Sequence, residues 1–133
     1  MEHYEQRGAQ NLMTMENSKS FLIDVIRIVP EGSDCYVQAP SLDDKETLEL
    51  MKPSEYSYYK IIKLEGLNKI KFIERLKTGD IGQYMQSMEI KIGQRILFEG
   101  WDGIEFGLIS KTIILPHWFI DKYKDMYDIS KEW

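Results

Sequence analysis

The chain has few of the residues that most often carry enzyme chemistry. Its 133 residues include one cysteine, Cys35, and two histidines, His3 and His117. A single thiol closes no disulfide within the chain and builds no cysteine zinc site. The sequence also lacks the glycine-rich phosphate loop, the dinucleotide-binding glycine fingerprint and the calcium-loop pattern. We therefore expect no cofactor and no metal.

Long hydrophobic runs are also missing. No apolar run exceeds four residues, whereas a membrane helix needs about 18 or more. Residues 1–20 have neither the basic start nor the apolar stretch of a secretory signal. These absences predict a cytoplasmic protein without a membrane partner. We interpret residues 1–19 as a polar N-terminal tail and residues 20–133 as a single domain.

The overall composition is that of an ordinary folded domain. Hydrophobic residues make up 43% and charged residues 29%, which excludes a disordered chain. Acids exceed bases by 22 to 17, so the net charge is −5. This balance disfavours a uniformly basic nucleic-acid-binding protein. The charge is uneven, however, with a net −6 over residues 1–59, +4 over 60–95 and −3 over 96–133.

The pattern of apolar residues predicts an α+β fold, a mostly antiparallel sheet with helices packed on one face. In the N-terminal half, β-branched side chains predict a buried strand over residues 21–29 and a short return strand over 35–38. A helix is expected over residues 42–52, with Ser41 as its N-cap. Residues 56–65 fit a helix or a strand, and Gly66 as a C-terminal stop favours the helix. Another helix is expected over residues 68–77.

The C-terminal half has clearer strand and turn signals. Strands are expected over residues 88–92, 95–100 and 104–110, with Asp102-Gly103 as a two-residue hairpin turn. In that register Gly107 lies across from Phe98, an aromatic ring over a glycine. Pro116 is expected to open a final helix. The apolar side of that helix is predicted to carry Phe119, Tyr123, Met126 and Tyr127.

Acidic and aromatic residues supply the candidate binding surface. Acidic faces with tyrosines suit docking onto a basic protein, because charge steers association and tyrosine provides contact area at low entropic cost. Trp101 and Trp118 are candidate interface anchors. The predicted partner-binding residues are Asp43, Asp44, Glu46, Glu49, Glu55, Tyr56, Tyr58, Tyr59, Trp101, Asp102 and Trp118.

These features favour a small acidic, non-catalytic protein-binding module. Its most economical form is an immunity or antitoxin protein that neutralises a basic toxin or effector. One alternative is a nucleic-acid-associated accessory protein, which would use the lysines and aromatic residues of segment 60–77. The other is a small carboxylate-dependent enzyme using Glu99, Asp102 and Glu105. A regular hairpin argues against that enzyme, because it points Glu99 and Glu105 to opposite faces of the sheet.

Overall fold

A seven-stranded sheet runs through the whole computed structural model, which describes residues 18–133. The strand order is β2-β3-β1-β4-β5-β6-β7, and every neighbouring pair is antiparallel except β6 and β7, which are parallel. The described residues form one α+β domain, as the sequence predicts. The strands are β1 (Ser33–Gln38), β2 (Met51–Pro53), β3 (Lys60–Leu64), β4 (Ser87–Ile92), β5 (Arg95–Trp101), β6 (Phe106–Ile109) and β7 (Tyr127–Ile129).

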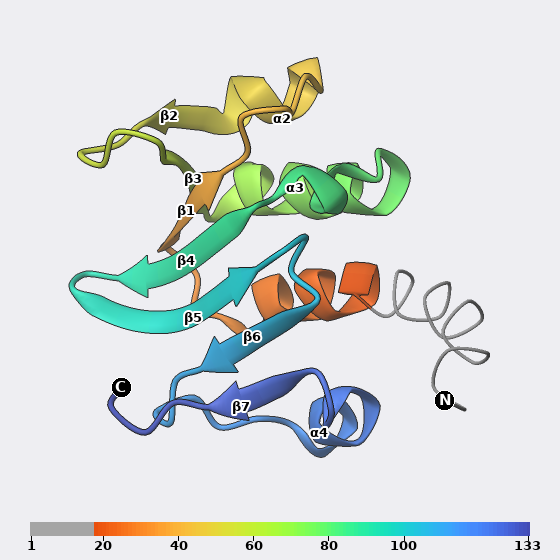
Figure 1. Ribbon diagram of the computed structural model, residues 1–133, viewed down its shortest axis with the longest axis vertical. Helices are drawn as coiled ribbons and strands as arrows, with labels where there is room; N and C mark the ends of the chain where they lie inside the picture. Colours follow the sequence, from red (N-terminus) through yellow and green to blue (C-terminus); the bar gives the residue numbers. More distant parts are fainter. Residues whose placement is uncertain (1–17) are drawn as a thin grey trace, which may run out of the picture.

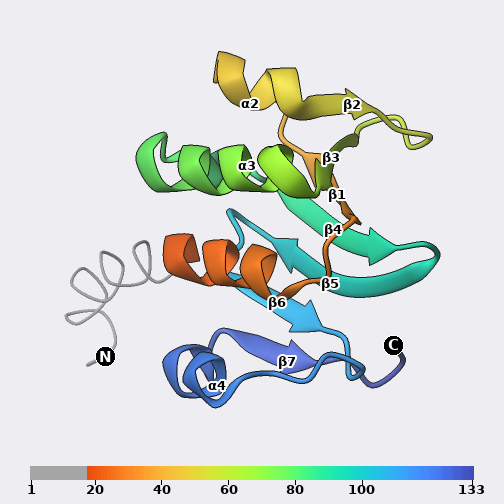
Figure 2. The ribbon, with the colours of Figure 1, turned by 180° about the vertical axis from the view of Figure 1, so that it is seen from behind.

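Helices cover one face of this sheet, which is seen from opposite sides in Figures 1 and 2. They are the helix over residues 18–28, α3 (Gly66–Thr78) and α4 (His117–Tyr123). The short helix α2 (Lys45–Leu50) packs against α3 and leads into β2, and a 3-10 turn, η1 (Ile81–Tyr84), follows α3. Within residues 18–133, no helix is both long and apolar enough to cross a membrane.

The helix over residues 18–28 corrects the strand predicted over residues 21–29. Apolar side chains at 21, 22, 25, 26 and 29 repeat with the period of a helix, and all of them are buried. Phe21 packs edge-on against Phe98 of the sheet, with the ring centroids 6.0 Å apart. Because this helix is buried on nearly all sides, its sequence lacks the polar face that is usual for a helix. The nearly continuous apolar run that results resembles the sequence of a buried strand. Of the predicted tail, residues 1–17 lie outside the described residues, while residues 18 and 19 belong to this helix.

The helix predicted over residues 56–65 is a strand over its second half. In β3, Ile62 and Leu64 alternate towards the core and are fully buried. This period-two alternation, together with pairing to β1 on one side and β2 on the other, outweighs the weak helical pattern. Gly66 is the first residue of α3 instead of a C-terminal stop, so α3 begins two residues before the predicted start.

Helix α2 is shorter than predicted at both ends. Its N-cap is Asp44, not Ser41, because the Asp44 carboxylate accepts a hydrogen bond from the Thr47 backbone N–H at 3.1 Å. Its C-terminal residue is Leu50, and Met51 already belongs to β2. The predicted strand over residues 35–38 is confirmed as the greater part of β1.

The β5–β6 hairpin has a longer turn than the predicted two residues. Trp101 pairs with Phe106, so residues 102–105 form a four-residue loop. Asp102, Gly103 and Ile104 all adopt positive φ there. Gly107 therefore lies opposite Gly100 instead of Phe98. The Phe98 ring nevertheless covers both glycines, close enough to leave no room for a Cβ atom at either.

The predicted last helix is divided into a helix and a strand. Helix α4 buries Phe119 and Tyr123, as expected, but it ends at Tyr123. After a short turn the chain pairs in parallel with β6, which places Tyr127 on β7 and leaves Met126 in the turn. The pattern of apolar spacing continues across the turn, so periodicity alone does not reveal this break.

Candidate functional site

The sheet face opposite the helices carries a continuous row of partly exposed side chains. Tyr36 of β1 pairs with Ile61 on one side and with Glu89 on the other. Glu89 pairs with Glu99, and Glu99 pairs with Leu108. Directly paired residues project to the same face of a sheet, so these five side chains stand side by side. We call this side of the sheet the open face; Figure 1 is viewed from it.

The loop between β2 and β3 folds two tyrosines onto this row. The Ser54 hydroxyl lies 2.9 Å from the Tyr56 carbonyl oxygen and 2.7 Å from the Tyr59 carbonyl oxygen, which holds the loop in a tight turn. The Tyr59 hydroxyl is 2.7 Å from the Ser87 hydroxyl of β4. The Tyr56 ring lies 5.7 Å from the Tyr36 ring, measured between centroids. The loop is thus fastened to the sheet at both tyrosines.

These side chains border a cavity of about 300 Å³ that is open to solvent and is lined by Tyr36, Tyr56, Tyr59 and Glu89. We call it the tyrosine pocket. Three of its four lining residues are tyrosines, and Tyr36 and Glu89 come from the paired strands β1 and β4. Aromatic faces carry partial negative charge and attract cations, especially organic ones.

A lysine of the chain itself already lies over these rings. The Lys91 ammonium is 5.2 Å from the ring centroids of both Tyr36 and Tyr56 and forms an ion pair of 3.0 Å with Glu89. The hydrogen bond with Glu89 raises the pKa of Lys91, so the ammonium stays charged. The pocket therefore stabilises a positive charge within its own structure.

Carboxylates outnumber this lysine around the pocket. Glu55 accepts a hydrogen bond from the Tyr36 hydroxyl at 3.2 Å, and desolvation together with that bond raises the pKa of Tyr36. Glu99 lies directly opposite Glu89. Desolvation, followed by repulsion from Glu89, raises the pKa of Glu99. Three carboxylates thus face one ammonium on this part of the open face.

The structure gathers some of the predicted partner-binding residues here. Glu55, Tyr56 and Tyr59 border the tyrosine pocket, and Tyr58, in the same loop, is 78% exposed. Trp101 is on the open face, paired with Ser87. Sequence reasoning missed Tyr36, Glu89, Lys91 and Glu99 as members of this site. Their alternation with buried neighbours is visible in the sequence, but only the strand register brings them together.

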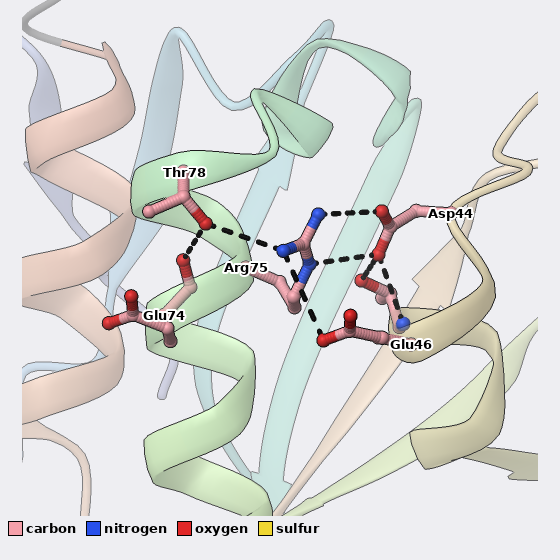
Figure 3. A network of polar contacts seen from close by, with 6 residues as sticks. Asp44, Glu46, Glu74, Arg75 and Thr78 are labelled. Atoms are coloured by element: carbon pink, nitrogen blue, oxygen red, sulfur yellow. Dashed lines mark hydrogen bonds and ion pairs between the residues drawn. The ribbon is translucent and has the colours of Figure 1, made fainter.

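The acidic residues around α2 form a separate group, in which Asp44 is engaged within the chain. Two nitrogens of Arg75 in α3 donate to its carboxylate, at 2.8 and 3.1 Å (Figure 3). The Thr47 hydroxyl donates to the same carboxylate. Hydrogen bonding from Arg75 is the main cause that lowers the pKa of Asp44 to about 2. Glu46 is more remote, 4.0 Å from Arg75. Asp43, Glu46 and Glu49 are exposed around α2.

The other two predicted residues lie away from the open face. Asp102 is in the β5–β6 loop and lines a second cavity of about 520 Å³ together with Glu105, Leu22 and Leu76. The two leucines belong to the helical side of the sheet. Trp118 is half exposed on α4, where its ring packs edge-on against Phe119.

The carboxylates of the enzyme alternative are therefore divided between the two sides of the sheet. Glu99 is on the open face, whereas Asp102 and Glu105 line the second cavity. Within residues 18–133, no cluster of three or more histidine, cysteine or acidic side chains is arranged to hold a metal ion. Cys35 is fully buried in β1, and this burial raises the pKa of its thiol.

The basic segment 60–77 is also divided. Lys63 projects from β3, while Lys69 and Arg75 are on α3 in the helical layer. Each forms an ion pair within the chain: Lys63 with Asp34, Lys69 with Glu31 and Arg75 with Asp44. The positive charges of the segment are therefore divided between a strand and a helix, and three of them form ion pairs within the chain.

Comparisons with protein-family models, with curated proteins and with solved structures found no match to this chain.

Proposed function

We propose that the chain is a non-catalytic protein-binding module that binds a basic polypeptide through its open face. The observation that carries the proposal is the tyrosine pocket, where aromatic rings and an excess of carboxylates meet around a cation. Tyrosine is enriched at interfaces because one end is apolar and the other forms hydrogen bonds. Neutralisation of a basic toxin or effector, as by an immunity or antitoxin protein, is the form of this function that we favour.

Charge and shape both support a basic partner over nucleic acid. Around the tyrosine pocket, aromatic area is combined with Glu55, Glu89 and Glu99, which outnumber Lys91, and this local excess of negative charge repels phosphate groups. Three lysine and arginine residues of segment 60–77 are already paired with carboxylates of the chain itself. Long-range attraction between the acidic face and a basic partner raises the association rate and makes it sensitive to salt.

The test uses a short synthetic peptide rich in lysine and arginine, titrated into the isotopically labelled protein. We expect amide shifts to concentrate on β1, β4, β5 and the β2–β3 loop. Raising the salt from about 0.05 M to about 0.5 M shortens the Debye length severalfold and should weaken binding strongly. An acidic peptide of the same length is the ligand control.

Two charge-matched double variants make the test specific for the face. Glu89→Gln with Glu99→Gln removes two charges from the open face, while Glu74→Gln with Asp121→Asn removes two from exposed positions on α3 and α4. The first pair should weaken peptide binding by about tenfold or more, because it removes carboxylates that contact the ligand. If both pairs of substitutions weaken peptide binding equally, or if the amide shifts are confined to the helical side of the sheet, the open face is not the binding surface.

A further inference from the structure

Beside the tyrosine pocket, only one of two facing carboxylates has a cation partner among the described residues. Glu89 and Glu99 stand directly opposite each other on neighbouring strands, a like-charge pair that destabilises a sheet. Lys91 forms an ion pair with Glu89. Among the described residues, no lysine or arginine nitrogen lies within 4.0 Å of the Glu99 carboxylate. A second cation between these carboxylates would relieve the repulsion.

Lys91 indicates which kind of cation the pocket accepts. Its ammonium lies 5.2 Å from the centroids of the Tyr36 and Tyr56 rings and 3.5 Å from the Tyr56 hydroxyl. This environment of ring faces and carboxylates suits an organic cation, whereas a metal ion prefers several oxygen ligands around it. The volume of about 300 Å³ is at the lower limit of ligand pockets and suits a single side chain.

A guanidinium group matches this pocket better than an ammonium. It is planar and stacks on tyrosine rings, and its fork of N–H donors can bond two carboxylate oxygens at once. Glu89 lines the pocket, and Glu99 lies directly opposite it on the adjacent strand. Arginine is also among the side chains most enriched at the energetic centres of interfaces.

We propose that the tyrosine pocket binds an arginine side chain of the partner, and that Lys91 is a resident cation which the arginine displaces from Glu89. This inference rests on the proposed function and specifies its ligand. The guanidinium stacks against the tyrosines and is bonded by Glu89 and Glu99, while Lys91 moves out towards solvent on its flexible side chain. Displacement of Lys91 lowers the affinity for every cation by the same factor, so the preference for arginine over lysine comes from ring stacking and from the paired N–H donors of the guanidinium.

The experiment compares two acetylated and amidated peptides that share a glycine-serine background and differ only in a single arginine or lysine. Binding to the full chain is followed by amide and tyrosine ring shifts. We expect the arginine peptide to shift Tyr36, Tyr56, Glu89 and Glu99, and the lysine peptide to bind several-fold more weakly. Calcium ions at the same concentration should not compete.

Lys91→Met and Lys52→Met are the decisive pair of variants. Each removes one positive charge from the open face, but Lys52 is exposed on β2 opposite Ile61, away from the tyrosine pocket. Lys91→Met should raise the affinity for the arginine peptide about three- to fivefold, because the resident cation no longer has to leave. Lys52→Met should change the affinity for the arginine peptide less than about twofold, because the charge that it removes acts on the pocket only through solvent and is screened by salt.

The outcomes separate this inference from the proposed function. If the polybasic peptide binds the open face but the single-arginine peptide does not, the proposed function stands and the pocket inference is wrong. Equal effects of the two methionine variants, equal affinity for arginine and lysine, or competition by calcium would also overturn the inference. If the polybasic peptide does not bind at all, the proposed function itself fails. Glu99→Gln, which leaves Lys91 in place, should weaken arginine binding and checks the result with a second variant.

Discussion

At the scale of single residues, Asp44 joins two helices through one carboxylate. It caps α2 through Thr47 and accepts two hydrogen bonds from Arg75 of α3. A cap satisfies a backbone N–H that would otherwise lack a partner. The contact with Arg75 also fixes α2 against the helical layer. Asp44 is therefore committed to holding the fold, whereas its neighbour Asp43 remains exposed.

Replacing Asp44 with alanine should lower the free energy of unfolding at pH 7 by about 2 kcal/mol, because the cap and the arginine bonds are lost together. Asp43→Ala is the matched control and should change it by less than about 0.5 kcal/mol. Urea unfolding of both variants measures the difference. A similar loss from the two substitutions would show that the Asp44 contacts add nothing to stability.

The stabilisation by Asp44 should also depend on pH. Its pKa in the folded chain is about 2, below the usual 3.8. A depressed pKa stabilises the folded state above the unfolded pKa, and this contribution is lost as the pH falls towards the folded pKa. The difference in free energy of unfolding between the parent chain and Asp44→Ala should therefore become smaller as the pH falls from 4 to 2. A constant difference over that range would contradict the stabilising role of the ionised Asp44 carboxylate.

At the scale of elements, the β5–β6 hairpin depends on two glycines that lie beneath one ring. Gly100 and Gly107 pair with each other, and the Phe98 ring occupies the space that their side chains would fill. The backbone of the hairpin can pass close to Phe98 only because both positions lack a Cβ atom. The ring in turn packs against Phe21, so the hairpin is packed directly onto the helix over residues 18–28.

Gly107→Ala should destabilise the fold by about 1–3 kcal/mol, because the new methyl group forces Phe98 or the backbone to shift. Gly82→Ala is a suitable control, since a Cβ there would meet Leu22 and Leu76 at ordinary contact distances of 3.8 and 3.9 Å. It should be neutral or slightly stabilising. Thermal and urea unfolding compare the two variants. Adding Phe98→Leu should recover part of the loss in Gly107→Ala, and failure to do so would point to a different cause.

Secondary structure was predictable where one periodicity dominated. Residues 88–91 alternate between buried and partly exposed side chains and lie in β4. Residues 95–100 form most of β5, where the apolar run is long enough to indicate a strand although Leu97 and Phe98 are both buried at an irregularity in the β4–β5 register. The segment 21–29 was misleading because Ile23, Val25 and Ile26 favour strands by residue type, whereas their burial against helices and sheet stabilises a helix. Strand β7 could not be predicted, since three residues are too few to show a period and its partner β6 is provided by tertiary pairing.

At the scale of the whole molecule, a buried hydrogen bond joins the first and last helices of the described chain. The Tyr123 hydroxyl of α4 donates to the Asp24 carboxylate at 2.5 Å. Arg27 and Lys122 also form ion pairs with Asp24, at 3.0 and 3.5 Å. This network explains why a nearly continuous apolar run contains an aspartate. It closes the helical layer between segments that are 99 residues apart.

Tyr123→Phe should lower the free energy of unfolding by about 1–2 kcal/mol, because a buried acceptor loses its hydroxyl partner while the ring packing remains. The two cations that stay with Asp24 keep the loss moderate. Tyr127→Phe is the control: that ring also packs on Phe21 and Phe119, and the change should be within about 0.5 kcal/mol. Equal stabilities of the two variants, measured by urea unfolding, would rule out a structural role for the Asp24 bond.

The candidate site was predictable only in part, because the arrangement of the whole sheet determines which of its residues lie together. Acidic and tyrosine-rich stretches of sequence indicated Glu55, Tyr56 and Tyr59. Tyr36, Glu89 and Glu99 come from three different strands, and each is an ordinary surface residue in its own segment. Only the pairing of β1 with β4 and of β4 with β5 places them together.

The two outermost strands of the sheet have a consequence for how chains meet one another. Strands β2 and β7 have three residues each, and β2 includes Pro53, which has no N–H to donate. Fibrils and strand-exchanged dimers grow from long edges with unpaired backbone groups. A sheet of seven strands with such short borders offers little template for this kind of polymerisation. We therefore expect the open face to remain accessible in a concentrated solution, because the edge strands of different chains do not readily pair with one another.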